Sequence, residues 1–329
     1  LAPVPHRGPG RLFHRPEREA TPMPDAPATL IALDWGTSSL RAYLLDAAGQ
    51  VRDHRESAHG IRALPEGGFP AAFVEAVGGW PEALPVLMSG MIGSRSGWRE
   101  APYAEAGPAG VGLAELAAEL TEVSDLTGRP AWIVPGVAVR GPAGPDVMRG
   151  EETQVVGAGL SEATIALPGT HSKWVELRGG RIAGFRTSMT GELYAALSRH
   201  TILADTLSPP ADAAEDAAGF AEGLAAARAL EKPGDLLGAF FSIRARALFA
   251  ELAPGRTGPF LSGLLIGAEI AANAPENAEV RLIANAALAA RYATALSAFG
   301  LASRSLPPDI AAAGLHALAR AARLTGETA

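Results

Sequence analysis

The chain has 329 residues, of which 48% are apolar and 19% charged, and this composition excludes an intrinsically disordered protein. Its length exceeds what one ordinary core holds and predicts two domains. The formal net charge of -7 argues against nucleic acid and anionic membranes as partners, and the absence of cysteine excludes disulfides, thiolate metal sites and a cysteine nucleophile.

Residues 1–27 differ in composition from the rest of the chain. They carry several arginines among many prolines, without the apolar stretch of a secretory signal, and we expect a disordered tail. The longest uncharged apolar run, at 260–268, is too short to cross a bilayer. Because a chain without cysteine is also compatible with a reducing compartment, we expect a cytoplasmic protein with no membrane partner.

The first half of the chain predicts a series of strands with two helices. An apolar run at 30–33 ends in a Gly-Thr turn, and the next two runs continue it as an antiparallel meander. A later strand empties into a Gly-Ser loop, the kind of position where ligand loops gather. We expect strands at 30–33, 40–45, 51–56, 85–94 (with its loop) and 132–139, helices at 69–77 and 151–160, and a Pro-Gly-rich loop at 141–150.

The second half restarts with strands and then turns helical, because its apolar residues recur at helical spacing. We expect strands at 164–167, 172–177, 181–187 and 281–284, and helices at 211–230, 235–252, 260–273 and 285–299. This order of strands, helices, strand and helix matches the first half. It predicts a duplicated domain, with an N-terminal lobe at 28–159 and a C-terminal lobe at 160–329.

Two strings repeat one local pattern of a buried strand, a Gly-Thr turn and a second strand: IALDWGTSSLRAYLL at 31–45 and TIALPGTHSKWVEL at 164–177. Glycine lets the backbone approach a ligand and threonine adds a hydroxyl, so Gly36 with Thr37 and Gly169 with Thr170 are candidate phosphate contacts. Asp34 adds a carboxylate suited to a hydrated Mg²⁺. Two ordinary β-hairpins are the alternative, but the repetition favours a phosphotransferase that grips a nucleotide between its halves.

Polar residues follow the second turn. Lys173 offers a compact positive charge to a phosphate, and His171 offers a hydrogen-bond donor. Since side chains alternate along a strand, Thr170 and Ser172 point one way and His171 and Lys173 the other, so at least one of these pairs is structural. Further along the chain, Thr190 is expected to cap the start of a helix.

Six strings between residues 34 and 269 together form a specific set: DWGTSSLRA (34–42), MSGMIGSRSGW with Ala101, Pro102 and Tyr103 following (88–103), VMRGEETQ (147–154), LPGTHSKW (167–174), FRTSMTGELY (185–194) and FLSGLLIGAE (260–269). The chain resembles the sugar-kinase branch of the actin-like ATPase superfamily, and more narrowly it is similar to the 2-dehydro-3-deoxygalactonokinase family. The resemblance implies an α/β fold of two duplicated RNase H-like lobes, each of mixed sheet plus helices, with a nucleotide cleft between them. The six strings follow the family's order.

The chain departs from the family on the adenosine side. Where the family's loop has glycine followed by hydroxylated residues, this chain has Asn285, Ala286 and Ala287. Asparagine tolerates a left-handed backbone better than most residues, so we expect the turn to be kept. The missing hydroxyls leave the details of nucleotide contact open.

The resemblance implies transfer of the γ-phosphoryl group of ATP to the 6-hydroxyl of 2-dehydro-3-deoxy-D-galactonate, in galactonate catabolism. It implies ATP and Mg²⁺ as cofactors, with Asp34 as a catalytic residue that orients the metal. The residues implied to hold ATP lie in and beside the two turns and in the adenosine-side loop: Gly36, Thr37, Ser38, Gly169, Thr170, His171, Lys173 and Asn285.

Glu151 is the candidate general base, because it begins a helix after a glycine and lies one strand before the second turn, which is the position of the acidic base in the sugar kinases that this chain resembles. Glu152 is its rival, since neighbours on a helix point about 100° apart and only one of them can face the cleft. Both glutamates could instead be charges that favour the helix dipole.

The substrate side is expected in the first lobe. A carboxylate substrate needs an arginine, for which Arg149 is the first candidate and Arg186 the second, although either could form a structural ion pair. Ser89, Met91 and Trp98 lie in or after the loop where related sugar kinases hold their sugar. Trp98 could stack on the sugar or simply pack.

Two other functions stay open. One is a kinase of the same fold that acts on another small sugar acid or sugar. The other is a non-catalytic nucleotide- and sugar-binding actin-like module such as a repressor, although residues 1–27 are too short and proline-rich for the DNA-binding segment that repressors usually add. The expected ligands are a small-molecule sugar acid and ATP, with no nucleic acid, and a homo-oligomer is compatible with the sequence.

Overall fold

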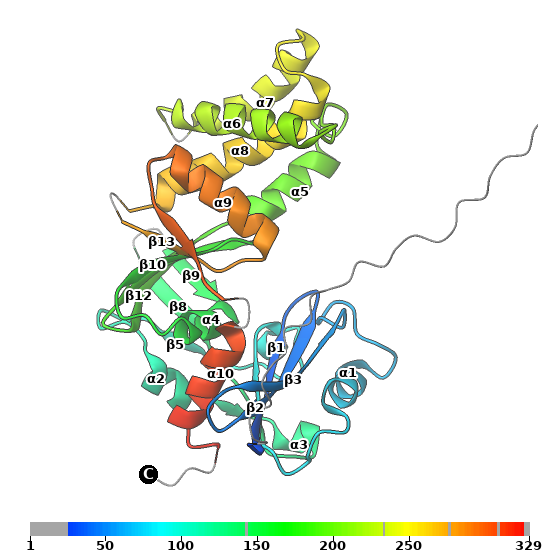
Figure 1. The fold of residues 1–329 in the computed structure, drawn as a ribbon, viewed down its shortest axis with the longest axis vertical. Coiled ribbons are helices and arrows are strands. Elements are labelled where there is room, and N and C mark those ends of the chain that lie inside the picture. Colours follow the sequence, from blue (N-terminus) through cyan, green and yellow to red (C-terminus); the bar gives the residue numbers. More distant parts are fainter. Residues whose placement is uncertain (1–25, 142–143, 233, 276–277, 308–309, 326–329) are drawn as a thin grey trace, which may run out of the picture.

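The computed structural model describes residues 26–141, 144–232, 234–275, 278–307 and 310–325. The tail expected at 1–27 therefore lies outside the described residues, apart from its last two. Figure 1 shows an elongated molecule with one sheet near its lower end, a second sheet at mid-height and a group of helices beyond the second sheet. Within the described ranges, no helix combines the length and the hydropathy needed to span a membrane.

The first sheet contains the three strands of the predicted meander, the strand expected from residue 85, the first part of the run at 132–139 and one short strand that was not predicted. Its central strand, β1, is antiparallel to β2 and parallel to β4, and β2 is antiparallel to β3. The sheet order is β3-β2-β1-β4-β7-β6. The strands are β1 (Ala28–Trp35), β2 (Leu40–Asp46), β3 (Val51–Ser57), β4 (Val86–Ser89), β6 (Thr121–Glu122) and β7 (Ala131–Ile133).

The second sheet repeats this topology. Its central strand, β10, is antiparallel to β11 and parallel to β13, and the sheet order is β12-β11-β10-β13-β14. The strands are β10 (Ala163–Leu167), β11 (Ser172–Arg178), β12 (Arg181–Ser188), β13 (Val280–Leu282) and β14 (Ser303–Ser305). The same pairing pattern in both sheets confirms the predicted fold class, two duplicated α/β lobes of the actin-like ATPase type.

Helices cover both sheets and extend the second one. They are α1 (Gly68–Val77), α2 (Leu113–Ala118), α3 (Ser124–Thr127), α4 (Glu151–Gly157), α5 (Thr190–His200), α6 (Ala213–Arg228), α7 (Asp235–Leu248), α8 (Pro254–Asn273), α9 (Ala286–Ala298) and α10 (Ile310–Ala321). Helix α8 begins six residues before its predicted start at Phe260, because Pro254 occupies the first turn, where its fixed φ favours a helix. Helix α5 was not predicted beyond its first residues.

The single strand predicted at 132–139 is wrong. The structure divides it into β7 and β8 (Gly136–Gly141), and Pro135, which has no N–H to donate to a sheet, lies between them. The loop predicted at 141–150 contains a further strand, β9 (Gly144–Met148), which pairs with β8. With β5 (Tyr103–Glu105) these strands form a third sheet of order β5-β8-β9, and β9 leads directly into the start of α4.

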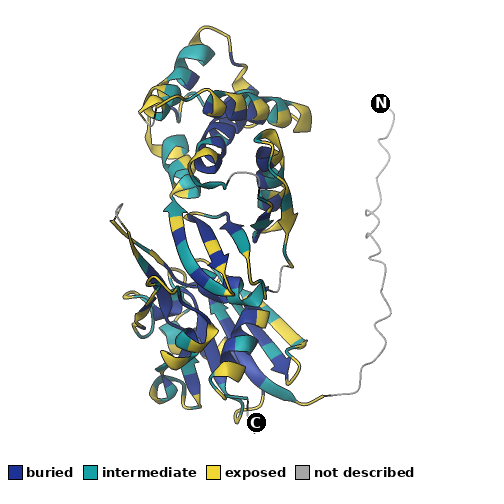
Figure 2. Ribbon diagram, turned by 90° about the vertical axis from the view of Figure 1, so that its left-hand side faces the viewer, coloured by how far each residue is buried: buried dark blue, intermediate teal, exposed yellow. Residues whose placement is uncertain are grey.

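The core lies on both faces of the central strands. In β1, Leu30 and Ala32 pack on one side and Ile31 and Leu33 on the other, which explains the continuous apolar run of that strand. Figure 2 shows buried residues along the strands of both sheets. Helix α10 follows β14 of the second sheet in the chain, yet it packs against α4 and against β1 of the first sheet (Figure 1). The two lobes are therefore joined through α4 and α10.

Candidate active site

Both Gly-Thr turns open into one cavity of about 820 Å³. Gly36 and Thr37 of the first turn line it together with Gly169 and Thr170 of the second, although the two turns are more than 130 residues apart in the chain. Predicted site residues that also line the cavity are Asp34, Met91, Arg149, Glu151, His171 and Asn285. The shared cavity is the arrangement that a nucleotide gripped between two halves requires.

The first turn is held in place by the segment that follows β3. Ile61 N–H donates to Gly36 O at 3.1 Å, and Arg62 N–H donates to Thr37 O at 3.2 Å. A Cβ on Gly60 would overlap the backbone of Thr37, so glycine is required for this close approach. The turn is thus supported from behind while its other side faces the cavity.

Charged side chains form a row across the first sheet. Arg41 lies opposite Asp34 on β1 and opposite Glu56 on β3, and all three line the cavity. Arg41 Nη1 lies 3.6 Å from Asp34 Oδ2, and Arg41 Nε donates to Glu56 Oε1 at 3.0 Å. Burial raises the pKa of Asp34; Arg41 opposes this rise, and the Glu151 and Glu56 carboxylates add to it. A cation beside Asp34 would therefore stabilise its ionised form.

Arg41 and Glu56 were not among the predicted site residues. A signal for them was present, because a hairpin that turns at Gly36 places Arg41 directly across from Asp34.

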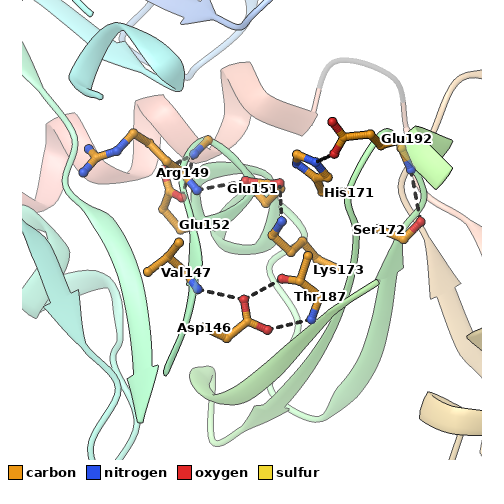
Figure 3. A network of polar contacts seen from close by, with 12 residues as sticks. Asp146, Val147, Arg149, Glu151, Glu152, His171, Ser172, Lys173, Thr187 and Glu192 are labelled. Carbon is orange, nitrogen blue, oxygen red and sulfur yellow. Dashed lines mark hydrogen bonds and ion pairs between the residues drawn. The ribbon is translucent and has the colours of Figure 1, made fainter. Parts of the chain in front are cut away.

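The two neighbouring glutamates at the start of α4 have different surroundings. Glu151 lines the cavity, and its Oε1 lies 3.5 Å from Lys173 Nζ, while its Oε2 accepts a hydrogen bond from Arg149 N–H at 3.0 Å (Figure 3). Glu152 is fully buried, and its oxygens accept from Gly150 N–H at 2.8 and 2.7 Å. Of the two carboxylates, Glu151 is therefore the one that faces the cavity.

Burial raises the pKa of Glu152 from 4.5 to about 8, with a further contribution from the Glu151 carboxylate. At a pH between these two pKa values, the unfolded chain has released the Glu152 proton, whereas the folded protein keeps it. The free energy of unfolding therefore falls as pH rises, by about 1.4 kcal/mol per pH unit. Glu152→Gln keeps an acceptor for Gly150 N–H and removes the titration. We expect its melting temperature to exceed that of the wild type increasingly from pH 5 to 8. A difference in melting temperature between the two proteins that stayed constant over this pH range would contradict the prediction.

Arg149 supports the loop before α4. Its Nη2 donates to Ala101 O at 2.7 Å and to Pro102 O at 3.3 Å, and its guanidinium stacks over the Tyr103 ring, 4.2 Å from the centroid. In Figure 3 the side chain points away from the Glu151 carboxylate. The guanidinium thus ties the segment around Ala101 to the start of α4, and its role toward a substrate carboxylate stays a prediction. Arg41, whose side chain is 42% exposed at the cavity, is a second arginine within reach of a ligand.

Five predicted site residues do not line the cavity: Ser38, Ser89, Trp98, Lys173 and Arg186. Ser38 is exposed on the first turn, and Ser89 is buried, where it accepts a hydrogen bond from the Thr153 hydroxyl at 3.4 Å. Trp98 packs against the aromatic rings of the first lobe, with Phe69 stacked on it at 6.1 Å.

Arg186 and Lys173 lie on opposite faces of the second sheet. Arg186 is exposed and pairs across the strands with Trp174, whereas Lys173 pairs with Thr187 and reaches Glu151. The expected alternation after the second turn therefore holds for Ser172 and Lys173: Lys173 contacts Glu151, and the Ser172 hydroxyl contacts the hydroxyl of Tyr292.

The expected left-handed conformation of Asn285 is wrong. Its φ is -62°, and its side chain caps α9 by accepting a hydrogen bond from Leu288 N–H at 3.0 Å. Capping satisfies a free N–H at the helix start, which explains an asparagine here. The cap expected from Thr190 is also wrong, because Met189 occupies the cap position and the Thr190 hydroxyl donates to Glu269 instead.

Comparison with known proteins assigns the family. The family model described as 2-keto-3-deoxy-galactonokinase matches residues 34–318. A probable 2-dehydro-3-deoxygalactonokinase of Rhizobium meliloti (strain 1021) is 40% identical over 301 residues, covering 88% of this chain and 96% of the relative. The 2-dehydro-3-deoxygalactonokinase of Escherichia coli (strain K12) is 38% identical over 302 residues, covering 89% and 98%.

A solved structure agrees with this result. It is the crystal structure of a protein from Sinorhizobium meliloti, provisionally assigned as a 2-dehydro-3-deoxygalactonokinase, which is 40% identical and superposes with a TM-score of 0.79 over 89% of this chain and 98% of that one. The chain belongs to the 2-keto-3-deoxy-galactonokinase family.

Proposed function

We propose that this kinase transfers the γ-phosphoryl group of ATP to the 6-hydroxyl of 2-dehydro-3-deoxy-D-galactonate. Membership of the family supplies the reaction class and the use of ATP. The observation that carries the proposal is the single cavity in which both Gly-Thr turns face the Glu151 carboxylate. A donor phosphate and an acceptor hydroxyl can meet there in line, as phosphoryl transfer requires.

The two turns hold the phosphates in this proposal. Gly36 and Thr37 approach from the first lobe and Gly169 and Thr170 from the second, so backbone N–H groups and threonine hydroxyls surround the phosphate oxygens from both sides. His171 lines the cavity beside the second turn and bonds to Glu192 at 2.6 Å, which fixes the direction of its ring.

Asp34 would hold Mg²⁺. In the described part of the chain, no group of three or more histidine and acidic residues is placed to hold a metal alone. Mg²⁺ bound to a nucleotide usually takes only one or two carboxylates, with phosphates and water as its other ligands, so the partly buried Asp34 carboxylate at the cavity wall fits this mode. When bound, Mg²⁺ would neutralise phosphate charge.

Glu151 would act as the general base for the 6-hydroxyl. Its carboxylate is fixed from two sides, by Lys173 at 3.5 Å and by Arg149 N–H at 3.0 Å, and its remaining accepting positions face the cavity. Lys173 itself is 5% exposed, so it acts on Glu151 from behind and does not reach the cavity. Its position supports a role in orienting the base.

The function is tested by measuring ADP release with a panel of 2-keto-3-deoxy sugar acids, including the C4 epimer of the proposed substrate. We expect the highest kcat/KM for 2-dehydro-3-deoxy-D-galactonate. A higher value for another acid or sugar would assign the kinase to that substrate. Binding of ATP and sugar acid without any phosphorylated product would favour the non-catalytic module and overturn the proposal.

The lobes at 28–159 and 160–329 are proposed as the two domains, because the two large sheets lie on either side of this boundary. We further propose a cytoplasmic location, since ATP, the donor that the family uses, is supplied there.

We also propose that the chain forms a homodimer through α7. Leu237, Phe241 and Leu248 lie on one side of this helix and are 74%, 60% and 71% exposed. In an antiparallel pair with a second copy, Leu237 would meet Leu248 and Arg244 would meet the ring of Phe241, so the face is complementary to itself.

Phe241→Asp tests the α7 face by placing a charge at its centre. We expect the wild type to sediment as a dimer and this variant as a monomer, because an unpaired carboxylate is costly to bury. Val74→Asp on α1 is the matched control, since Val74 is 65% exposed outside this face. A monomeric wild type at high concentration, or dissociation by both substitutions, would contradict the dimer.

A further inference from the structure

Two of the motifs, at 185–194 and 260–269, each place a polar side chain that the mechanism above does not use, Thr190 and Glu269, in the second lobe. Thr190 of the first motif donates its hydroxyl to Glu269 of the second. Glu269 is only 4% exposed. A carboxylate so buried needs several hydrogen-bond donors around it to offset the loss of water.

Glu269 accepts hydrogen bonds from three other elements. Trp174 Nε1 of β11 donates to Oε1 at 2.8 Å, the Tyr292 hydroxyl of α9 donates to Oε2 at 2.8 Å, and the Thr190 hydroxyl of α5 also donates to Oε2. An indole N–H can only donate, and an ionised carboxylate can only accept, so the set is matched when Glu269 is charged. One side chain of α8 therefore joins α5, α9 and β11.

A first path leads from Glu269 to the second Gly-Thr turn through Tyr292. The Tyr292 hydroxyl lies 3.2 Å from the Ser172 hydroxyl, and Ser172 Oγ accepts from Gly169 N–H at 3.4 Å. Because Tyr292 donates to Glu269, its oxygen is free to accept from Ser172, and every bond in the series then runs in the same direction.

A second path leads through Thr190, the first residue of α5. The next residue, Gly191, packs so closely on the turn that a Cβ there would lie 2.5 Å from Gly169 O and 2.9 Å from Thr170 Cα. Glu192 N–H then donates to Thr170 O at 3.0 Å. The bond from Thr190 to Glu269 thus fixes the end of the helix that presses on the turn.

We propose that Glu269 is a positioning residue that holds the second Gly-Thr turn in the conformation that receives the phosphates of ATP, an inference that rests on the proposed function of that turn. Donors fixed in advance need no reorganisation when the phosphates arrive. Losing Glu269 should therefore weaken nucleotide binding. Sugar-acid binding should change little, because none of the Glu269 contacts reaches the first lobe.

Glu269→Gln tests the proposal while keeping the side chain's size. Glutamine has one acceptor oxygen, and its amide nitrogen would face at least one of the three donors. We expect calorimetry to show a Kd for ATP that is raised about 5- to 50-fold, because this factor corresponds to the loss of one or two strong hydrogen bonds. The KM for the sugar acid should stay within about 2-fold of the wild-type value. Tyr292→Phe and Thr190→Val each cut one path, and each should raise the Kd for ATP by a smaller factor.

Thr257→Val is the matched control. Thr257 is fully buried on the same helix, and its hydroxyl bonds to Ser208 N–H at 2.9 Å and to Pro254 O at 2.6 Å, away from the turn. This variant should lower the melting temperature and leave the Kd for ATP unchanged. If it raised the Kd as much as Glu269→Gln does, the effect would be one of general stability and the positioning role would be wrong.

Thr170→Val separates this proposal from the function of the turn itself. If Thr170→Val binds ATP like the wild type, the Thr170 hydroxyl does not hold a phosphate and that part of the proposed function is wrong. If Thr170→Val weakens ATP binding but Glu269→Gln is folded and binds normally, only the positioning role fails. Should Glu269→Gln not fold, Tyr292→Phe and Thr190→Val decide, and wild-type Kd values in both would overturn the proposal.

Discussion

Replacing Glu151 by glutamine is expected to lower kcat by about 10²- to 10⁴-fold, the usual contribution of a general base. Glutamine keeps an oxygen that can accept from Arg149 N–H, so the loop before α4 should stay in place. What is lost is the ability to take the proton of the attacking hydroxyl. The KM for ATP should stay within about 3-fold of wild type, because the groups proposed to hold the phosphates are untouched.

Glu152→Gln is the matched control for Glu151→Gln. The two substitutions are chemically identical and adjacent, but Glu152 is buried beneath Gly150, while Glu151 faces the cavity. Steady-state kinetics with saturating ATP, alongside melting curves, would distinguish lost chemistry from lost folding. If Glu152→Gln abolished turnover and Glu151→Gln kept most of it, the base would be Glu152.

Local features of this site could be predicted from the sequence. A strand, a turn and a second strand are neighbours in the chain, so Gly36, Thr37, Gly169 and Thr170 could be identified without knowing the fold. The resemblance then implied that they meet, and the shared cavity agrees. Arg41 could have been found by the same reasoning, since its position opposite Asp34 follows from the hairpin.

Features that depend on contacts distant in the chain could not be predicted. The direction of the Arg149 guanidinium is set by the carbonyl groups of Ala101 and Pro102, 48 and 47 residues away. Glu269 meets Trp174 across 95 residues and Thr190 across 79, so nothing near any of these positions shows that they share a hydrogen-bond network. Thr190 was expected to cap its own helix because the start of that helix could be recognised from the neighbouring sequence. Its actual partner, Glu269, is too distant in the chain to be recognised in this way.

Helices α4 and α10 cross at a very short distance, with one glycine of each helix at the contact. A Cβ on Gly157 of α4 would lie 2.8 Å from Gly314 N and closer still to Ile310 O. A Cβ on Gly314 of α10 would lie 2.8 Å from the carbonyl carbon of Thr153 and 3.0 Å from Gly157 N. The Cβ on Gly157 would overlap Ile310, which lies four residues before Gly314 in α10. The Cβ on Gly314 would overlap Thr153, which lies four residues before Gly157 in α4. The two glycines are thus equivalent in the two lobes, and both helices approach to backbone contact.

Gly314→Ala is expected to reduce the free energy of unfolding by about 2–3 kcal/mol, because backbone atoms of α4 occupy the space that the methyl group needs and cannot rotate away. For a chain of this size the melting temperature should fall by roughly 5–10 °C. Turnover should fall as well. Helix α4 begins with Glu151 and α10 begins at the cavity wall with Ile310, so separating the helices displaces the base from the second turn.

Ala313→Ser is the control for this substitution, since it adds one heavy atom at the neighbouring, exposed position of the same helix. It should change the free energy of unfolding by no more than about 0.5 kcal/mol. Thermal unfolding and kcat, measured for both variants, separate the steric effect from any general weakness of α10. If Gly314→Ala kept both its melting temperature and its turnover, the two helices would be free to move apart, and the lobes could not be held in place by their crossing.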